Sequence, residues 1–186
     1  RTYRRFIRGK QGVVWMFDDE SGVRRVKGNT DGPVNCTDYT KANGGLPINH
    51  VNDAFEDTQA RLWAMTSSGI TIIDAQGKAR TIAKGIFFRR GIQIGKQMLA
   101  LTNTGLVYAF DENGRELRRI PIAADVNNIK MVSASFQWHG CWMIMTNNQT
   151  IMVNPKQGTA AATEKYHVRG GALMEGLTND DNYFVS

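Results

Sequence analysis

The chain has 186 residues, of which 41% are hydrophobic and 9% aromatic, and this length is enough to bury a sizeable core. Twenty-three Lys and Arg against seventeen Asp and Glu give a net charge of +6. No nucleic-acid motif and no aromatic interleaving accompany this charge, so we predict no nucleic-acid partner and assign most of it to solvated outer strands.

Short apolar runs separated by turn residues follow one another along the chain. The first expected strand lies near Tyr3, and the second is 12–17, followed by an acidic turn and Gly22. The clearest unit has strands expected at 51–57, 61–66, 70–74 and 78–83. Later copies are 97–102 with 105–111, then 141–146 with 150–153, and the chain ends at 182–186 inside an expected second strand.

These runs form a repeat of about 40 residues. When Trp15, Trp63, Leu99, Trp142 and Phe184 are taken as equivalent, the intervals are 48, 36, 43 and 42 residues. A period near 40 with several short strands per unit is typical of a β-propeller blade. No window carries a helical spacing of apolar residues without a glycine or Asx turn to interrupt it.

The turns agree with antiparallel hairpins, because a Thr-x-x-Gly pattern recurs at Thr66 to Gly69 and at Thr102 to Gly105. We therefore predict an all-β propeller fragment of about four four-stranded blades and a partial fifth. The expected units are 1–44, 45–85, 86–124, 125–168 and a partial 169–186. Open strand edges of such a fragment predict self-association.

Signals for catalysis and cofactors are weak. The three histidines lie in different units without metal-ligand spacing, so no metal or cofactor is predicted. The acidic cluster Asp18, Asp19 and Glu20 is explained by turn chemistry. Cys36 and Cys141 fall in non-neighbouring units and are expected to be buried, unpaired thiols, while Trp138 lies off the repeated Trp position and is expected at the surface.

The stretch 51–57 followed by 62–70 resembles the two-component regulator propeller repeat, although Ala60 and Met65 stand where that repeat usually has glycine. The resemblance implies a periplasmic sensor region of a hybrid two-component system of gut Bacteroidetes. It further implies a non-catalytic module that senses an oligosaccharide and works with other domains of the same sensor. Two alternatives stay open: a fragment of a propeller-fold glycan lyase or hydrolase, and a protein-interaction propeller.

The ligand surface is expected where loops between blades meet hairpins between second and third strands. Arginine and asparagine side chains there suit sugar hydroxyls and carboxylates, which would favour an acidic saccharide. The candidate binding residues are Asn49, His50, Arg89, Arg90, Asn103, Asn127, Asn128, His167 and Arg169, with Asp18 and Asn147 in the same hairpins.

Overall fold

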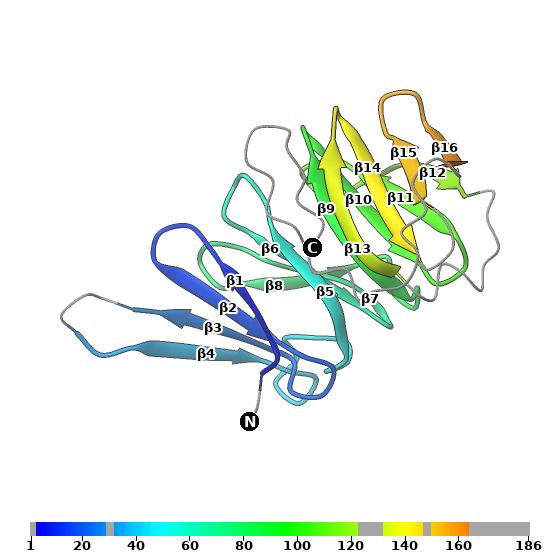
Figure 1. Cartoon of the computed structure of the whole chain (residues 1–186). Coiled ribbons are helices and arrows are strands. Elements are labelled where there is room, and N and C mark those ends of the chain that lie inside the picture. Colours follow the sequence, from blue (N-terminus) through cyan, green and yellow to red (C-terminus); the bar gives the residue numbers. More distant parts are fainter. Residues whose placement is uncertain (1–2, 29–31, 123–131, 147–149, 164–186) are drawn as a thin grey trace. The chain divides into compact units, whose positions relative to one another are not determined.

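The computed structural model describes residues 3–28, 32–122, 132–146 and 150–163. Every regular element in these ranges is a β-strand, and the strands form four separate four-stranded antiparallel sheets (Figure 1). In the described ranges there is no helix long and apolar enough to cross a membrane. The chain divides into two compact units, Arg1–Gly91 and Ile92–Ser186, and the division falls within a strand.

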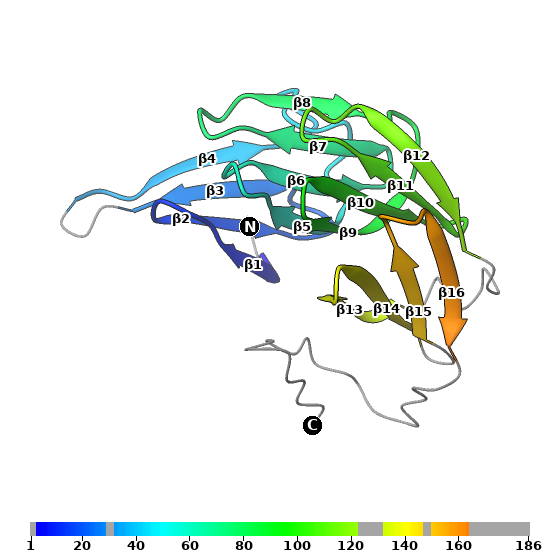
Figure 2. The same ribbon diagram turned by 90° about the horizontal axis from the view of Figure 1, so that it is seen from above.

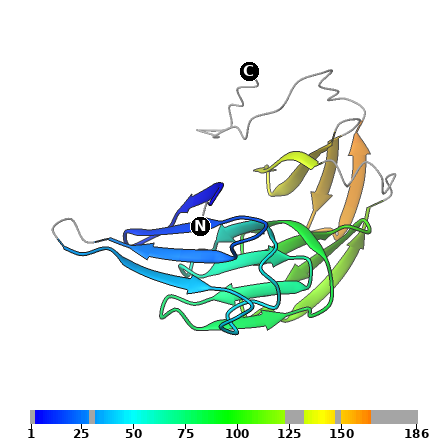
Figure 3. The same cartoon turned by 90° about the horizontal axis from the view of Figure 1, so that it is seen from below.

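The first unit contains blades 1 and 2. Blade 1 has the strand order β1-β2-β3-β4, with β4 at its outer edge (Figure 3). Its strands are β1 (Arg5–Arg8), β2 (Val13–Phe17), β3 (Val23–Lys27) and β4 (Asn35–Tyr39). Blade 2 repeats this order with β5 (Val51–Glu56), β6 (Leu62–Thr66), β7 (Gly69–Ile73) and β8 (Ala79–Ile82).

Blades 3 and 4 follow in the same meander order. Blade 3 consists of β9 (Phe88–Ile94), β10 (Gln97–Thr102), β11 (Leu106–Phe110) and β12 (Glu116–Pro121). Blade 4 consists of β13 (Val132–Trp138), β14 (Cys141–Thr146), β15 (Thr150–Asn154) and β16 (Thr159–Thr163). The outer strands β12 and β16 lie near each other in the second unit (Figure 2). The predicted fold class is confirmed for four blades, and the expected fifth lies outside the described residues.

The hairpins form where the sequence predicts them, because short polar side chains satisfy the turn backbone. Thr66 Oγ1 donates to the Gly69 carbonyl at 2.7 Å and accepts from Ser68 N at 3.1 Å. Asp74 and Asp111 each accept two backbone N–H groups through Oδ1, at 2.8 to 3.0 Å. These Asx turns end in glycines with positive φ, Gly77 at 89° and Gly114 at 77°.

Each unit has its own apolar core between two sheets. In the first unit, Trp15 and Phe17 of blade 1 pack with Leu62 and Ala64 of blade 2. In the second unit, Leu99, Leu101 and Val107 of blade 3 pack with residues of β14 and β15. The middle strands β6 and β7 are buried along their whole length, because both of their faces are covered.

Four of the five residues taken as equivalent are fully buried in second strands, and the fifth, Phe184, lies outside the described residues. Of the four, Trp142 faces the opposite side of its sheet. Trp63 and Leu99 each precede the turn threonine by three residues, whereas Trp142 precedes Thr146 by four. Because strand side chains alternate, this offset turns Trp142 to the other face, where it packs with Leu99 of the preceding blade. Met143, three residues before Thr146, is the residue that matches Trp63.

The two cysteines are both free thiols, but only Cys141 is buried. The expectation of a buried thiol is wrong for Cys36, which is exposed. It lies in β4, an outer strand whose first three residues are all exposed. Side chains project from the faces of the sheet, and little packs on either face at this end of the outer strand, as its burial pattern shows.

Candidate functional site

Five of the nine predicted binding residues lie in the described ranges: Asn49, His50, Arg89, Arg90 and Asn103. The other four, Asn127, Asn128, His167 and Arg169, lie outside them, as does Asn147. Of the described five, Asn49, His50, Arg89 and Arg90 belong to the first compact unit and Asn103 to the second.

Asn49 and His50 are half-buried in the loop that enters β5. Asn49 Oδ1 accepts from the Lys41 backbone N at 2.7 Å, which gives this side chain a structural role in the loop. Next to them, Val51 N donates to the Asp18 carbonyl at 3.1 Å. An inter-blade loop and a second hairpin therefore lie side by side here, as the sequence predicts.

Asp18 holds its own hairpin together. Its Oδ1 accepts from the backbone N–H groups of Glu20, at 2.8 Å, and Ser21. Burial opposes the charge of this carboxylate, but the two N–H groups stabilise it, and the resulting pKa is lower than usual. A carboxylate that stays ionised and is bound to its own turn is a poor general acid, which supports the turn explanation of the acidic cluster.

Asn103 lies half-buried at the tip of the hairpin from β10 to β11. The fully buried Thr102 anchors this hairpin, because its Oγ1 accepts from Thr104 N at 3.3 Å and Leu106 N at 3.1 Å. Asn103 thus lies in a turn whose backbone is hydrogen-bonded to the side chain of Thr102, the residue before it.

Arg89 and Arg90 do not lie in a loop, contrary to the prediction, because β9 already begins at Phe88. The guanidinium of Arg89 stacks over the Phe87 ring, with Cζ 5.2 Å from the ring centroid. Arg90 Nη1 lies 3.6 Å from Asp53 Oδ1, and its side chain is 18% exposed. These arginines are accommodated in a strand because an aromatic ring and a carboxylate lie beside them.

The first strands of the blades carry a connected polar group, here called the inner-strand cluster: Arg5, Asn52, Asp53 and Arg90. Arg5 Nη1 donates to the Asn52 carbonyl, and Asn52 Nδ2 donates to the Phe88 carbonyl at 2.7 Å. Asp53 Oδ2 accepts from Gly91 N at 3.0 Å, beside the ion pair with Arg90. A register shift between Val51 and Asp53 marks the start of β5 where this cluster forms.

Asp53 is the residue of this cluster that the sequence analysis missed. Burial raises the pKa of Asp53 to about 6, against the opposing effects of Arg90 and the Gly91 N–H. Such a group changes charge near neutral pH. The sequence does contain one signal for this pairing: Asn52-Asp53 and Arg89-Arg90 fall near the starts of consecutive repeat units.

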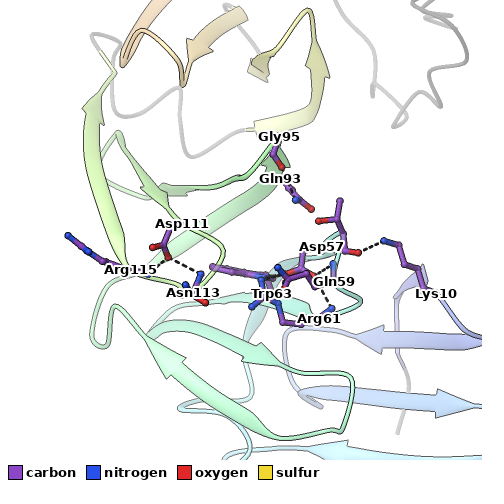
Figure 4. A network of polar contacts seen from close by, with 11 residues as sticks. Lys10, Asp57, Gln59, Arg61, Trp63, Gln93, Gly95, Asp111, Asn113 and Arg115 are labelled. Atoms are coloured by element: carbon purple, nitrogen blue, oxygen red, sulfur yellow. Dashed lines mark hydrogen bonds and ion pairs between the residues drawn. The ribbon is translucent and has the colours of Figure 1, made fainter.

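A second polar network lies at the opposite end of β5 and organises the hairpin to β6 (Figure 4). The Asp57 carboxylate is 1% exposed and accepts from Gln59 N, Arg61 N, Arg61 Nε and Trp63 Nε1, at 2.7 to 3.0 Å. All of its acceptor positions are thereby used within the hairpin. Asp57 is a structural residue of the blade and not a ligand group.

Blade 1 lacks this aspartate, and Gly9 stands in its place. Glu56 of the next blade supplies the missing carboxylate: Oε1 accepts from Lys10 N and Oε2 from Trp15 Nε1, both at 2.7 Å. A Cβ at Gly9 would come 2.3 Å from Glu56 Oε2, so the carboxylate occupies the space of the absent side chain. The two buried tryptophans thus have the same acceptor chemistry from different positions in the chain.

Trp142 has no such acceptor. Its Nε1 is buried and makes no hydrogen bond with the part of the chain that the structure describes. The hairpin before β14 is only His139-Gly140, with φ of 44° and 74°, and Trp138 takes the register position of Asp57. Trp138 itself is half-buried and 4.5 Å from the His139 ring, which agrees with the expectation of a surface position.

Within the described residues, no group of three or more His, Cys, Asp and Glu could hold a metal ion. The polar groups described above are arginines, amides and single carboxylates, held by neighbouring backbone, by an oppositely charged side chain or by an aromatic ring. Such groups can bind a hydroxylated or anionic molecule through hydrogen bonds.

Solved structures with the same fold include sensor domains of the bacterium B. thetaiotaomicron. The extracellular domain of its hybrid two-component system BT3049 matches 86% of this chain at 16% identity, with a TM-score of 0.64. The extracellular domain of BT4673, described as a one-component system, matches 95% at 15% identity, with a TM-score of 0.69. The predicted likeness to propellers of Bacteroides sensor regions is therefore confirmed as a likeness of fold.

A third match is PorZ, a surface component of the type-IX secretion system of Porphyromonas gingivalis, with a TM-score of 0.60 over 87% of this chain at 12% identity. The chain spans about a quarter of each matched protein: 23% of BT3049, 27% of BT4673 and 22% of PorZ. No protein-family model and no curated protein sequence matches it.

Proposed function

We propose that this chain is part of the extracytoplasmic, ligand-sensing propeller region of a two-component sensor. The observation that carries the proposal is its match in fold to two extracellular domains, that of the hybrid two-component system BT3049 over 86% of this chain and that of BT4673 over 95%. The module acts without catalysis, by binding a ligand and passing the bound state to other domains of the same sensor. Periplasmic exposure follows from the same proposal.

The proposed ligand is an oligosaccharide, and an acidic one suits the charge of the chain best. Supporting this are the net charge of +6, the half-buried Asn49 and His50 in the loop that enters β5, and Arg89 at the start of β9, whose guanidinium lies against an aromatic ring. An aromatic ring with a guanidinium against it is also a surface on which a sugar ring and its carboxylate fit.

Isothermal titration of the chain with oligogalacturonate and with an uncharged cello-oligosaccharide tests this proposal. We expect tighter binding of the acidic sugar, weakened at least tenfold by Arg89→Ala with Arg90→Ala. Arg90→Ala alone reports the cost of breaking the ion pair with Asp53, and Arg115→Ala with Arg118→Ala is the control for charge alone. Equal affinity in both double variants would exclude this surface as the site.

The likeness to PorZ favours a second function, that of a protein-interaction propeller at the cell surface. The two functions differ in what a screen should find. A sensor binds a soluble saccharide with one site per chain, whereas an interaction propeller binds none. Absence of binding to any member of a panel of neutral, acidic and sulfated oligosaccharides would favour the interaction propeller.

A further inference from the structure

The first strands of blades 1, 2 and 4 carry a polar residue at the same register. Arg8 pairs with Val14, Glu56 with Leu62, and Gln137 with Trp142. Leu62 and Trp142 lie on the face of their sheet that packs against the preceding blade. A side chain at this register therefore points toward the first hairpin of the blade before it.

Glu56 shows what this position does. Its carboxylate enters the hairpin of blade 1, where it binds Lys10 N and Trp15 Nε1 and fills the space beside Gly9. At the junction of blades 1 and 2, a hairpin that has no acid of its own therefore receives one from the next blade.

The same face of blade 1 is more exposed than that of blade 2, and we call it the leading face: Phe6, Arg8, Val14 and Met16. Phe6 is 61% exposed, whereas Ala54, its counterpart in blade 2, is 9% exposed. Val14 and Met16 are half-buried, whereas their counterparts Leu62 and Ala64 are fully buried. Arg8 is exposed and makes no ion pair or hydrogen bond among the described residues.

We propose that the leading face docks another propeller blade, one whose first hairpin carries a carboxylate that is free to pair with Arg8. A guanidinium cannot replace Glu56, because it has five donors and no acceptor and would face the N–H groups of a hairpin like that of Gly9. Opposite a carboxylate it gains charge-assisted hydrogen bonds. Docking also covers Phe6 and Met16, as blade 1 covers the same face of blade 2. The inference is independent of any ligand.

The test adds a blade to the full chain. A copy of residues 1–46 is fused ahead of Arg1, so that eleven residues join the copied last strand to β1, the same number that joins β4 to β5. The glycine-hairpin fusion keeps Gly9 in the copy, and the acid-hairpin fusion carries Gly9→Asp there. Each is made with and without Arg8→Glu in the original blade 1.

We expect Arg8→Glu to shift the melting temperature in opposite directions in the two fusions. Arg8→Glu should raise the melting temperature of the glycine-hairpin fusion, because it recreates the junction made by Glu56. The same substitution should lower that of the acid-hairpin fusion, each time by roughly 3 °C or more. Backbone amides of β1 should exchange at least tenfold more slowly in the favoured fusions than in the unfused chain.

Equal effects of Arg8→Glu in both fusions would overturn the proposal, as would β1 amides that exchange as fast in every fusion as in the unfused chain. Light scattering of the unfused chain tests the alternative that another copy of this chain occupies the leading face. A dimer that is lost with Arg8→Glu would assign the leading face to another copy of this chain and refute docking of an acid-hairpin blade.

Discussion

The contact between Glu56 and blade 1 can be tested by moving a carboxylate from one blade to the other. Glu56→Ala removes the acceptor of Trp15 Nε1, which is buried, and of Lys10 N, which is exposed enough for water to replace the acid. An unsatisfied buried donor costs about 1 to 3 kcal/mol, so we expect a loss of about 2 kcal/mol in unfolding free energy. For a chain of this length that lowers the melting temperature by roughly 4 to 8 °C.

The second half of the test introduces a carboxylate into blade 1 itself by the substitution Gly9→Asp. In the native chain Gly9→Asp should also destabilise, because its Cβ would come 2.3 Å from Glu56 Oε2 and bring a second carboxylate to the same place. In the Glu56→Ala background that space is empty, and Gly9→Asp recreates the bond that Asp57 makes to Trp63. We expect the double variant to recover at least half of the lost stability.

Urea unfolding followed by circular dichroism measures all four members of this cycle, with Glu112→Ala as the control. Glu112 also lies in a hairpin, and its side chain makes no hydrogen bond among the described residues. Additive losses from Glu56→Ala and Gly9→Asp would refute the reasoning, because they would show that the two positions do not share one carboxylate site.

Three further results are expected. Asp57→Ala should cost about 3 kcal/mol or more in urea unfolding, more than Glu56→Ala, because four donors lose a buried acceptor. Asp53 has its pKa raised from 3.8 to about 6, so it stabilises the fold most at acid pH and loses that contribution as pH rises from about 4 to 6; unfolding curves of Asp53→Asn should lack this slope, and an unchanged slope would contradict the assignment. Trp142→Phe should cost less in thermal unfolding than Trp63→Phe, because both leave a cavity in a buried core but only Trp63 also loses a hydrogen bond, and an equal cost would contradict this reasoning.

The blades themselves could be predicted from the sequence because their signals are local. A hairpin is fixed by a few adjacent residues, and the threonine, aspartate and glycine turns occur where the printed sequence suggests them. Strand bounds in blade 2 agree with the prediction to within about two residues for the same reason. Because side chains alternate along a strand, a turn that fixes the register also predicts which positions are buried.

The polar clusters could not be predicted in the same way, because they join residues far apart in the chain. Arg90 was expected to be available to a ligand, but Asp53, 37 residues earlier, pairs with it. Whether an arginine at a strand start is free depends on the register of the neighbouring blade, which a single repeat does not specify. The ion pair depends on the packing of Asp53 in β5 beside Arg90 at the start of β9.

Trp142 shows that an error of one residue in a repeat alignment has a physical meaning. Aligning the repeats on their tryptophans places Trp142 with Trp63, whereas aligning them on the turn threonine places Met143 there. The threonine is the better reference, because its hydroxyl is bonded into the hairpin and fixes the register of both strands. A tryptophan needs only a large space and an acceptor for its N–H, and Trp15 obtains that acceptor from the next blade whereas Trp63 obtains it from its own. Residues that set geometry therefore align repeats more safely than residues that fill the core.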